Sequence, residues 1–443
     1  MNDAATESAP VLKPSGPGVL LRPFQDRKLM MATIFLCAVV VQAGFLLVLP
    51  SAAKGNDSTD YVEYYAPVAE NILNGKGMID PSGKLGTLYP PGYPVFLAGA
   101  YDLADSLGME RIRLIVSLNL LLMSLGCLLV FWTAETIFNT RIALLSAGLW
   151  ITYLFNLWLI KQPNSEVPFI PLFYGAVYCI VRAIQGQGVG LVVAAGLLLG
   201  AAALVRPIVL LLAFVLAAAM VLNRMLSLQK RLSYAVILIA VFCLAVLPWE
   251  REVYLQTGQI VPLSTNGPSS ILDGLTFTRT SRTDQVRPWM PPSVAQWMQR
   301  TWENRQQLRT TGEIFRYLAS ELKENPKAVL ELTGMKLARS WFGTDTRSHE
   351  RVTQLIQLLY LGLGASGLFL AGGRFREQRC YIVLFIGLVL YFWGMTVVAL
   401  SILRYLVPVM AYLLIPGAVA VDALIAHWQR SRMGGAAGGW AGA

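Results

Sequence analysis

Residues 29–50 read LMMATIFLCAVVVQAGFLLVLP, and runs of this kind decide the fold of the chain. An α-helix of about 20 apolar residues is long enough to cross the roughly 30 Å hydrocarbon core of a bilayer. Over the 443 residues, hydrophobic residues make up 55% and charged residues 14%, whereas a soluble domain carries about 25% charged residues. The chain has too few charges to cover itself with a hydrated surface. The sequence therefore predicts an all-α polytopic membrane protein.

About ten runs are predicted to span the membrane. They are Leu29–Pro50, Arg113–Phe138, Ile142–Ile160, Val167–Ala183, Val189–Val205, Ile208–Leu222, Leu232–Trp249, Thr353–Gly372, Tyr381–Ser401 and Tyr405–Ala426. The fifth and sixth runs meet at Arg206-Pro207, so they form either a hairpin or one broken helix. The chain has four short basic segments, and all four lie on the same side of the membrane only if these two runs form a hairpin. The positive-inside rule favours that arrangement. We therefore expect a hairpin and two cytoplasmic termini.

This topology divides the chain into five parts. We expect a cytoplasmic tail over 1–28, a transmembrane module over 29–249, a large outer loop over 250–352, further spans over 353–426 and a second tail over 427–443. The first module contains an outer loop at 51–112. The loop over 250–352 is rich in Lys and Arg, which indicates either solvated helix faces or a phosphate-bearing partner.

Composition also limits the possible chemistry. The five cysteines lie within or at the ends of apolar runs, where we expect them to serve as packing residues. Two histidines are too few for a multi-histidine metal site. The formal net charge of +10 does not indicate nucleic acid here, because the placement of basic residues follows the membrane topology.

The first outer loop is the most informative polar stretch. Asp57 and Asp60 follow the first span, and a helical pattern then runs over Tyr61–Leu73 and ends near Gly75. Asp60 is a natural N-cap that Glu63 would complete as a capping box. The alternative is that Asp60 is a general base beside a tyrosine-rich surface suited to a sugar.

Two other segments carry structural predictions. Three prolines between Tyr89 and Pro94 predict a rigid, extended entry to a helix too short to span the bilayer. In the second outer loop, the pattern over Thr311–Leu332 predicts helices broken at Asn325-Pro326. The tryptophan-rich stretch over 289–302 suits an interfacial element.

Several ionisable residues are predicted to lie at the outer ends of spans: Asp57, Asp60, Glu166, Arg206 and Arg404. Such residues are costly at membrane depth and usually face a cavity or a partner, so together they outline one site. A structural interpretation remains open for each, because Glu166 could cap its helix and the two arginines could snorkel to the interface.

Several short motifs follow one another along the chain in the order typical of one protein family. They are the acidic start and Tyr61–Leu73 helix, Gly75-x-Gly77, YPPGYPVFLA from Tyr89, Asn164-Ser165-Glu166, Arg206-Pro207, Pro248-Trp249, Ser264–Gly267, Glu324-Asn325-Pro326 with Lys336, and Arg404-Tyr405-x-x-Pro408. This order resembles GT-C membrane glycosyltransferases, and more narrowly the branch of protein O-mannosyltransferases and the lipid A aminoarabinose transferase. Two departures are Glu250 after Pro248-Trp249, and a longer spacing that leaves Asp57 a rival to Asp60.

The resemblance implies inverting transfer of a sugar from a polyprenyl-phosphate donor to a glycan, lipid or protein acceptor. It also implies a bacterial inner (plasma) membrane location with the site facing outward. A carboxylate would accept the acceptor's proton, and arginines would bind the leaving phosphate. Catalytic candidates are Asp60, Asp57 and Glu166. Substrate-binding candidates are Arg206, Arg404, Tyr64, Tyr65, Tyr89, Tyr93 and Tyr405.

The remaining alternatives concern the class of protein and the cofactor. A secondary transporter or lipid flippase would place its site near the midplane within inverted repeats, which the sequence does not show. A polymerase-like enzyme would use a pyrophosphate-linked donor. No cofactor is required by the resemblance, although a divalent cation would fit some GT-C enzymes. The lipid bilayer and the lipid-linked donor are the expected partners, and nucleic acid is not.

Overall fold

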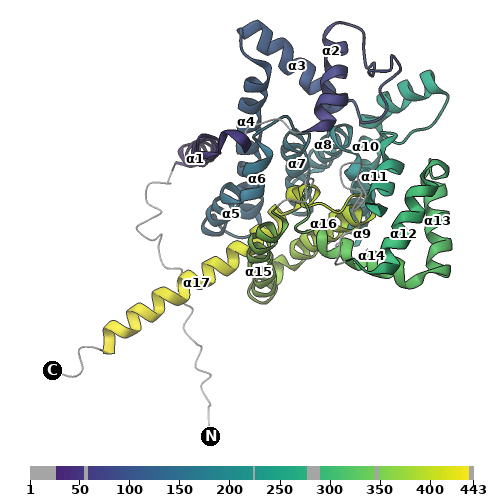
Figure 1. Ribbon diagram of the computed structural model, residues 1–443. Helices are drawn as coiled ribbons and strands as arrows, with labels where there is room; N and C mark the ends of the chain where they lie inside the picture. Colours follow the sequence, from purple (N-terminus) through teal and green to yellow (C-terminus); the bar gives the residue numbers. More distant parts are fainter. Residues whose placement is uncertain (1–25, 54–57, 223–224, 277–289, 345–348, 439–443) are drawn as a thin grey trace.

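The computed structural model describes residues 26–53, 58–222, 225–276, 290–344 and 349–438 (Figure 1). The regular structure of these residues is helical, apart from one isolated bridge between Ile79 and Leu85. The helices before the second polar region are α1 (Arg27–Val48), η2 (Ser51–Ala53), η3 (Tyr61–Tyr65), α2 (Ala66–Leu73), α3 (Gly92–Leu107), α4 (Arg111–Ile137), α5 (Thr140–Thr152), α6 (Leu154–Leu159), α7 (Glu166–Ile184), α8 (Val189–Val205), η4 (Pro207–Val209), α9 (Leu212–Leu222) and α10 (Leu228–Thr257).

The remaining helices form the second polar region and the last spans. They are α11 (Asn266–Leu275), α12 (Pro292–Glu303), η5 (Asn304–Gln307), α13 (Thr311–Glu324), α14 (Pro326–Arg339), α15 (Glu350–Arg374), η6 (Arg376–Gln378), α16 (Arg379–Val398), η7 (Leu403–Tyr405), η8 (Val407–Val409) and α17 (Ala411–Gly438). The predicted break at Asn325-Pro326 falls between α13 and α14, because proline is accepted at the first position of a helix.

The predicted all-α membrane class is confirmed. Within the described residues, seven helices are long and apolar enough to cross a membrane: α1, α4, α7, α10, α15, α16 and α17. Three shorter apolar helices, α5, α8 and the η4–α9 segment, account for the other predicted spans. The run predicted over Ile142–Ile160 is interrupted at Tyr153, whose extended backbone separates α5 from α6.

Helix α7 lies in the middle of the bundle (Figure 1). Nearly all its side chains are buried, and it packs against α4 and α8. A helix that is apolar around its whole circumference can be buried on every side. Because α7 begins at Glu166, its position in the bundle places this carboxylate deep within the protein.

The helices α8 and α9 form the predicted hairpin. A Cβ at Gly196 would lie 2.8 Å from Val241 Cβ, and one at Gly200 would lie 2.4 Å from Ala245 Cβ. The contacts advance in the same direction along α8 and α10, so these two helices run parallel. The intervening α9 must therefore run back, and both arms of the hairpin meet at Arg206.

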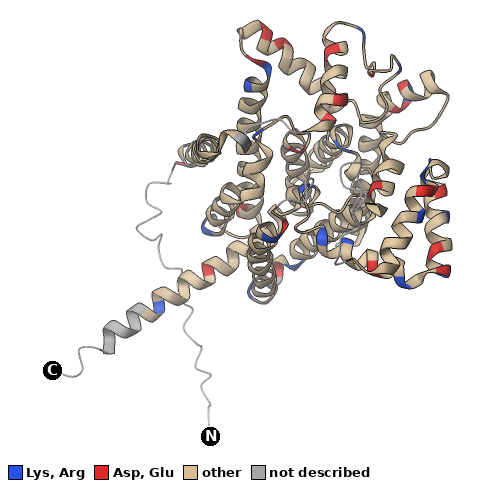
Figure 2. Cartoon of the chain, in the orientation of Figure 1, with Lys and Arg blue, Asp and Glu red and all other residues tan. Residues whose placement is uncertain are grey.

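The two polar regions flank the bundle, and Figure 2 shows charged residues gathered on α2, α3 and α12–α14, while the packed spans carry few of them. The region from α11 to α14 has its own hydrophobic core, which contains Trp297, Met298, Ile314 and Leu332. Trp297 is 1% exposed, so it contributes to this core rather than to a membrane surface.

Candidate active site

A cavity of about 300 Å³ lies where the first polar region meets the ends of the spans. Its walls come from five parts of the chain: the segment before η3, the start of α3, the start of α7, the α8–η4 joint, and the α16–η7 connection, with α11 at one edge. Of the predicted site residues, the cavity is lined by Asp60, Tyr65, Tyr89, Tyr93, Glu166, Arg206, Arg404 and Tyr405. The predicted convergence of ionisable groups on one site is thus present in the fold. Asp57 lies outside the described residues.

One wall of the cavity is built from two arginines around one carboxylate. Glu166 Oε1 lies 2.7 Å from Arg206 Nη1 and 3.0 Å from Arg404 Nε. The Glu166 side chain is 2% exposed, and the two arginine side chains are 16% and 23% exposed. The arginines are therefore turned inward onto Glu166 and do not snorkel. We call Glu166, Arg206 and Arg404 the cation wall.

Local sequence explains how these side chains reach the cavity. Pro207 ends α8, because proline lacks the amide hydrogen and biases the preceding residue toward extended backbone. Arg206 accordingly has φ −143° and ψ 121°, and its guanidinium donates to Ser165 Oγ at 2.8 Å. Arg404 lies in the short turn η7, and the Tyr405 ring lies 5.2 Å and 5.4 Å from the Arg206 and Arg404 guanidinium carbons. Both arginines are within cation–π distance of one ring.

Another wall of the cavity carries Asp60, and the capping interpretation of Asp60 is wrong. Asp60 has helical backbone angles and makes no capping hydrogen bond, whereas Ser58 Oγ accepts from the Tyr61 amide at 3.3 Å. Residues 59–60 are already helical ahead of Tyr61, so Ser58 takes the position at the start of the helix that Asp60 was predicted to take. This leaves the Asp60 carboxylate available to the cavity. It accepts from Tyr89 Oη at 3.0 Å and lies 4.0 Å from Arg404 Nη2.

Tyrosines surround Asp60 as a packed cluster. The ring centroids of Tyr65 and Tyr89 are 4.8 Å apart, as are those of Tyr65 and Tyr93. Burial raises the pKa of all three phenols, and the nearby Asp60 charge also contributes at Tyr65 and Tyr89. They therefore stay protonated at neutral pH, as neutral donors and ring surfaces. Tyr64 packs behind this cluster against Gly86, outside the cavity lining, and burial raises its pKa to about 12.

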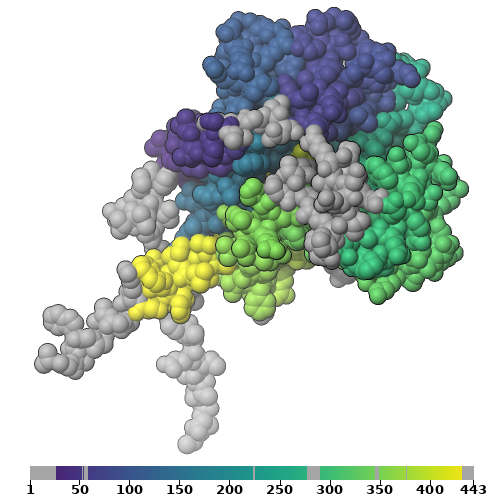
Figure 3. Space-filling model, in the orientation of Figure 1, coloured from purple at the N-terminus to yellow at the C-terminus, as the bar shows by residue number. Residues whose placement is uncertain are grey.

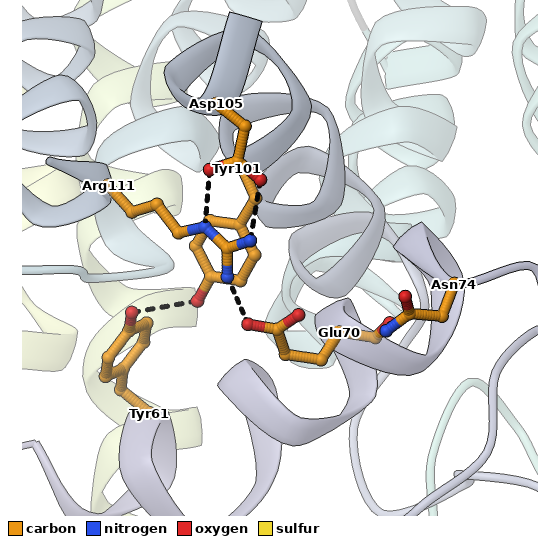
Figure 4. A network of polar contacts seen from close by, with 6 residues as sticks. All are labelled: Tyr61, Glu70, Asn74, Tyr101, Asp105 and Arg111. Atoms are coloured by element: carbon orange, nitrogen blue, oxygen red, sulfur yellow. Dashed lines mark hydrogen bonds and ion pairs between the residues drawn. The ribbon is translucent and has the colours of Figure 1, made fainter. Parts of the chain in front are cut away.

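A polar network anchors the helix that presents Asp60 (Figure 4). Tyr61 follows Asp60, and its hydroxyl lies 2.8 Å from the Tyr101 hydroxyl on α3. The Arg111 guanidinium lies 4.7 Å from the Tyr101 ring centroid, pairs with Asp105, and also pairs with Glu70 on α2. Arg111 thus joins the ends of α2, α3 and α4.

The second polar region contributes the edge of the cavity. Leu263 has a left-handed backbone with φ 63°; its amide donates to Glu250 Oε1 at 2.6 Å, and its carbonyl accepts from Trp249 Nε1 at 2.9 Å. The departure from the family pattern at Glu250 therefore has a local role, since its carboxylate holds this unusual turn. The Thr265 amide donates to the Thr87 carbonyl at 2.8 Å, which joins the two polar regions.

Some residues of the site carry no recognisable signal in the sequence. Ser58 and Ser270 line the cavity. Asp273 lies on α11, one helical turn after Ser270, and partial burial together with the nearby Asp60 charge raises its pKa. The spacing of Ser270 and Asp273 on one helix face could have suggested this pair, but only with knowledge that α11 borders the cavity.

The carboxylates do not form an evident metal centre in the described part of the chain. No group of three or more His, Cys, Asp or Glu side chains is close enough there to hold a metal ion. Glu166 is also occupied by two arginines.

Residues 89–249 match the family model of dolichyl-phosphate-mannose-protein mannosyltransferase. No curated protein matches the sequence. Among solved structures, the Archaeoglobus fulgidus oligosaccharyltransferase tethered with an acceptor peptide is similar over 92% of this chain and 51% of its own, with a TM-score of 0.57 and 15% identity. The same archaeon's oligosaccharyltransferase AglB, in complex with an inhibitory peptide and a dolichol-phosphate, is similar over 92% of this chain and 52% of its own. Its TM-score is 0.54 and its sequence identity is 13%.

The chain has a GT-C glycosyltransferase fold. It spans about half the length of the archaeal oligosaccharyltransferases it matches. ArnT from Cupriavidus metallidurans, bound to undecaprenyl phosphate, is also similar, with 15% identity, 88% and 76% coverage and a TM-score of 0.41. The segment that matches the mannosyltransferase model runs from Tyr89 through the GT-C bundle to Trp249, and contains Glu166 and Arg206 of the cation wall.

Proposed function

We propose that this protein is a membrane glycosyltransferase that moves a sugar from a polyprenyl-phosphate donor to an acceptor hydroxyl at the outer face of the membrane. One observation carries the proposal: Arg206 and Arg404 converge at one wall of a cavity that the Asp60 carboxylate also lines, 4.0 Å from Arg404. Sugar transfer from a phosphate needs both parts, namely cations where negative charge develops and a base where a proton is lost.

The proposed reaction is a single inverting displacement. The acceptor oxygen forms a bond to the anomeric carbon as its proton passes to Asp60. The bond between the anomeric carbon and the phosphate oxygen breaks, and the phosphate leaves with the electron pair. Asp60 is suited to this role because its side chain is 42% exposed, whereas the Glu166 side chain is 2% exposed and paired twice.

The role that suits Glu166 is orientation of the arginines. A buried carboxylate between two guanidinium groups fixes their positions before substrate arrives, so little reorganisation is needed as charge develops. Arginine suits the leaving phosphate because its planar fork binds two oxygens at once. Tyr405 supports both guanidinium groups from one side.

The apolar part of the cavity suits the isoprenoid chain of the donor. Ile208 and Leu210 from the α8–α9 hairpin line it, as do Met395 and Val398 from α16. Exposed apolar side chains continue outward beside this wall, with Leu211 53% exposed and Val398 43% exposed. We infer that the lipid enters between the hairpin and α16, while the acceptor approaches from the polar regions.

The deciding experiment combines cells and purified protein. Envelope glycans and glycolipids are compared by mass spectrometry with and without the protein, and the glycan that changes then defines the sugar and the acceptor. The purified protein should transfer that sugar from the corresponding polyprenyl-phosphate donor, leaving polyprenyl phosphate and inverting the anomeric carbon. An unchanged set of envelope sugars, or transport of the lipid without transfer, would contradict the proposal.

The outward orientation has a separate test. In a cysteine-free background, an impermeant maleimide applied from outside should label a cysteine at exposed Gln306 but not one at exposed Glu377. These positions lie on the second polar region and on the connection between α15 and α16, which the proposed topology places on opposite sides. The reverse labelling pattern would move the cavity to the cytoplasmic face.

A further inference from the structure

The end of α16 is held by a buried lysine from the second polar region. Lys336 of α14 is 4% exposed, and its ammonium donates to the Val398 carbonyl at 3.2 Å. Val398 is the last residue of α16. The last carbonyls of a helix have no partner within the helix and carry partial negative charge, so a cation there is favourable.

A second cation of α14 holds the residues that follow. Arg339 Nη1 donates to the Ser401 carbonyl at 3.0 Å, and Nη2 lies 2.7 Å from Glu350 Oε1. Just after α14, the Gly343 carbonyl accepts from the Leu403 amide at 2.9 Å. Residues 398–403 are therefore held at three points by α14 and the turn that follows it, and the next residue is Arg404.

Close packing leaves this segment little room to shift. A Cβ at Gly274 of α11 would lie 1.9 Å from the Ala399 carbonyl oxygen and 2.8 Å from Lys336 Nζ. A Cβ at Gly343 would lie 2.7 Å from the Ser401 carbonyl oxygen. Backbone from α11 and from the turn after α14 thus touches residues 398–403 directly, and only glycine permits this approach.

Burying the Lys336 ammonium costs free energy of desolvation, so we infer that this side chain does more than fill space. Among the described residues, no carboxylate lies within ion-pairing distance of Lys336, and burial lowers its pKa to about 7. The charged residues on the elements packed around it include Asp273 on α11 and Arg339 on α14 itself. An apolar side chain would avoid the desolvation cost but would leave the Val398 carbonyl without this donor.

We propose that Lys336 and Arg339 are positioning residues for Arg404: α14 clamps residues 398–403, and thereby fixes the guanidinium that binds the donor phosphate. The inference rests on the proposed function of the cation wall. It extends that function by making donor affinity depend on the second polar region, which lies outside the bundle and does not supply either arginine.

The first arm of the test measures the clamp without using activity. Lys336→Met removes the donor with little change in shape, while Lys336→Gln retains an amide donor without the charge. Lys327→Met is the matched control, because Lys327 lies on the same helix with its side chain 80% exposed. Hydrogen exchange of the peptides covering residues 399–406 should become faster in Lys336→Met, stay near wild type in Lys336→Gln, and be unchanged in Lys327→Met.

The second arm measures binding of undecaprenyl methyl phosphate, a phosphodiester that needs no knowledge of the sugar. Loss of a net hydrogen bond predicts a Kd about 3- to 10-fold higher in Lys336→Met, with recovery in Lys336→Gln and a larger loss in Arg404→Gln. Unchanged exchange in Lys336→Met overturns the clamp. Faster exchange with unchanged Kd, while Arg404→Gln binds weakly, overturns the link to Arg404. If Arg404→Gln binds as wild type does, the proposed phosphate role fails instead, and the exchange data still decide whether the clamp exists.

Discussion

The two walls of the cavity differ in how they are held. In the cation wall, Arg206 and Arg404 are mostly buried, share Glu166 Oε1, and are supported from within the bundle. Asp60 instead projects from the first polar region with its side chain 42% exposed; it accepts one hydrogen bond from Tyr89 and lies 4.0 Å from Arg404. The next residue, Tyr61, belongs to a polar network with Tyr101 and Arg111 (Figure 4).

The difference follows from what each wall is proposed to do. A cation removed from water costs free energy unless it is paired, so two arginines at this depth need a buried counter-ion. A general base must meet an acceptor that comes and goes, so it needs an open approach. In Figure 3, the parts that carry the two polar regions, coloured purple to blue and teal to green, lie on neighbouring sides of the molecule. The variants below test this division, from the largest expected effect to the smallest.

Asp60→Asn should have the largest effect. The substitution keeps the shape of the side chain but removes its basicity, so kcat should fall by about 10²- to 10⁴-fold. Because Ser58 rather than Asp60 caps the helix, the amount of folded protein in the membrane should not change. Initial rates and quantitative blots measure the two quantities. Asp102→Asn, an exposed change on α3, is the control. Full activity in Asp60→Asn would transfer the base role to Asp57 or Asp273.

Substitutions in the cation wall should act mainly on the donor. Arg206→Gln and Arg404→Gln each remove charge-assisted hydrogen bonds, so donor Kd should rise by about 10- to 100-fold while acceptor KM changes little. Lysine at either position should recover only part of this loss, because an ammonium cannot reproduce the planar fork. Titration with a polyprenyl-phosphate sugar measures the affinities, and Arg309→Gln serves as an exposed control. Complete recovery with lysine would show that length and charge suffice.

The network behind Asp60 should have a smaller effect. Tyr101→Phe removes one hydroxyl from the buried pair with Tyr61, so kcat should fall by about 3- to 10-fold with donor Kd unchanged. The double variant with Tyr61→Phe should be little worse than either single variant, because both remove the same hydrogen bond. Arg113→Gln controls for charge near Arg111, since the Arg113 side chain is 75% exposed. Additive losses in the double variant would show that the two hydroxyls act separately.

The smallest effect concerns stability and pH. Burial lowers the pKa of Lys336 from 10.5 to about 7, so above pH 7 the folded protein releases a proton that the unfolded chain still binds. The unfolded state binds more protons up to about pH 10, and stability rises with pH wherever this holds. The Tm of wild type relative to Lys336→Met should therefore increase by a few degrees between pH 7 and pH 9, measured in detergent. A constant difference across this range would place the amine in a more hydrated environment.

The sequence determined the parts that depend on local chemistry and on the bilayer. Long apolar runs predicted the spans, because every such run needs hydrocarbon around it. The clustering of basic residues distinguished a hairpin from a broken helix at Arg206-Pro207, and the parallel packing of α8 and α10 agrees with it. The helix over Tyr61–Leu73 followed from its helical pattern, and the break at Pro326 followed from the proline. The cation wall could be anticipated only as charges at the outer ends of spans.

Tertiary structure alone decided how those charges are arranged. One oxygen of Glu166 pairs with both Arg206 and Arg404, because three helix ends meet in the fold. No spacing in the sequence predicts that meeting. Ser58 caps the helix, so Asp60 is not used as a cap and lines the cavity instead. A shift of two residues in the start of a helix changes which side chain meets the free amides. In the sequence, Lys336 belongs to a motif of the second polar region, and nothing there indicates that it is buried. Its burial against the end of α16 arises only when the second polar region packs onto the bundle, because contacts between residues 62 positions apart are set by packing and not by local propensity.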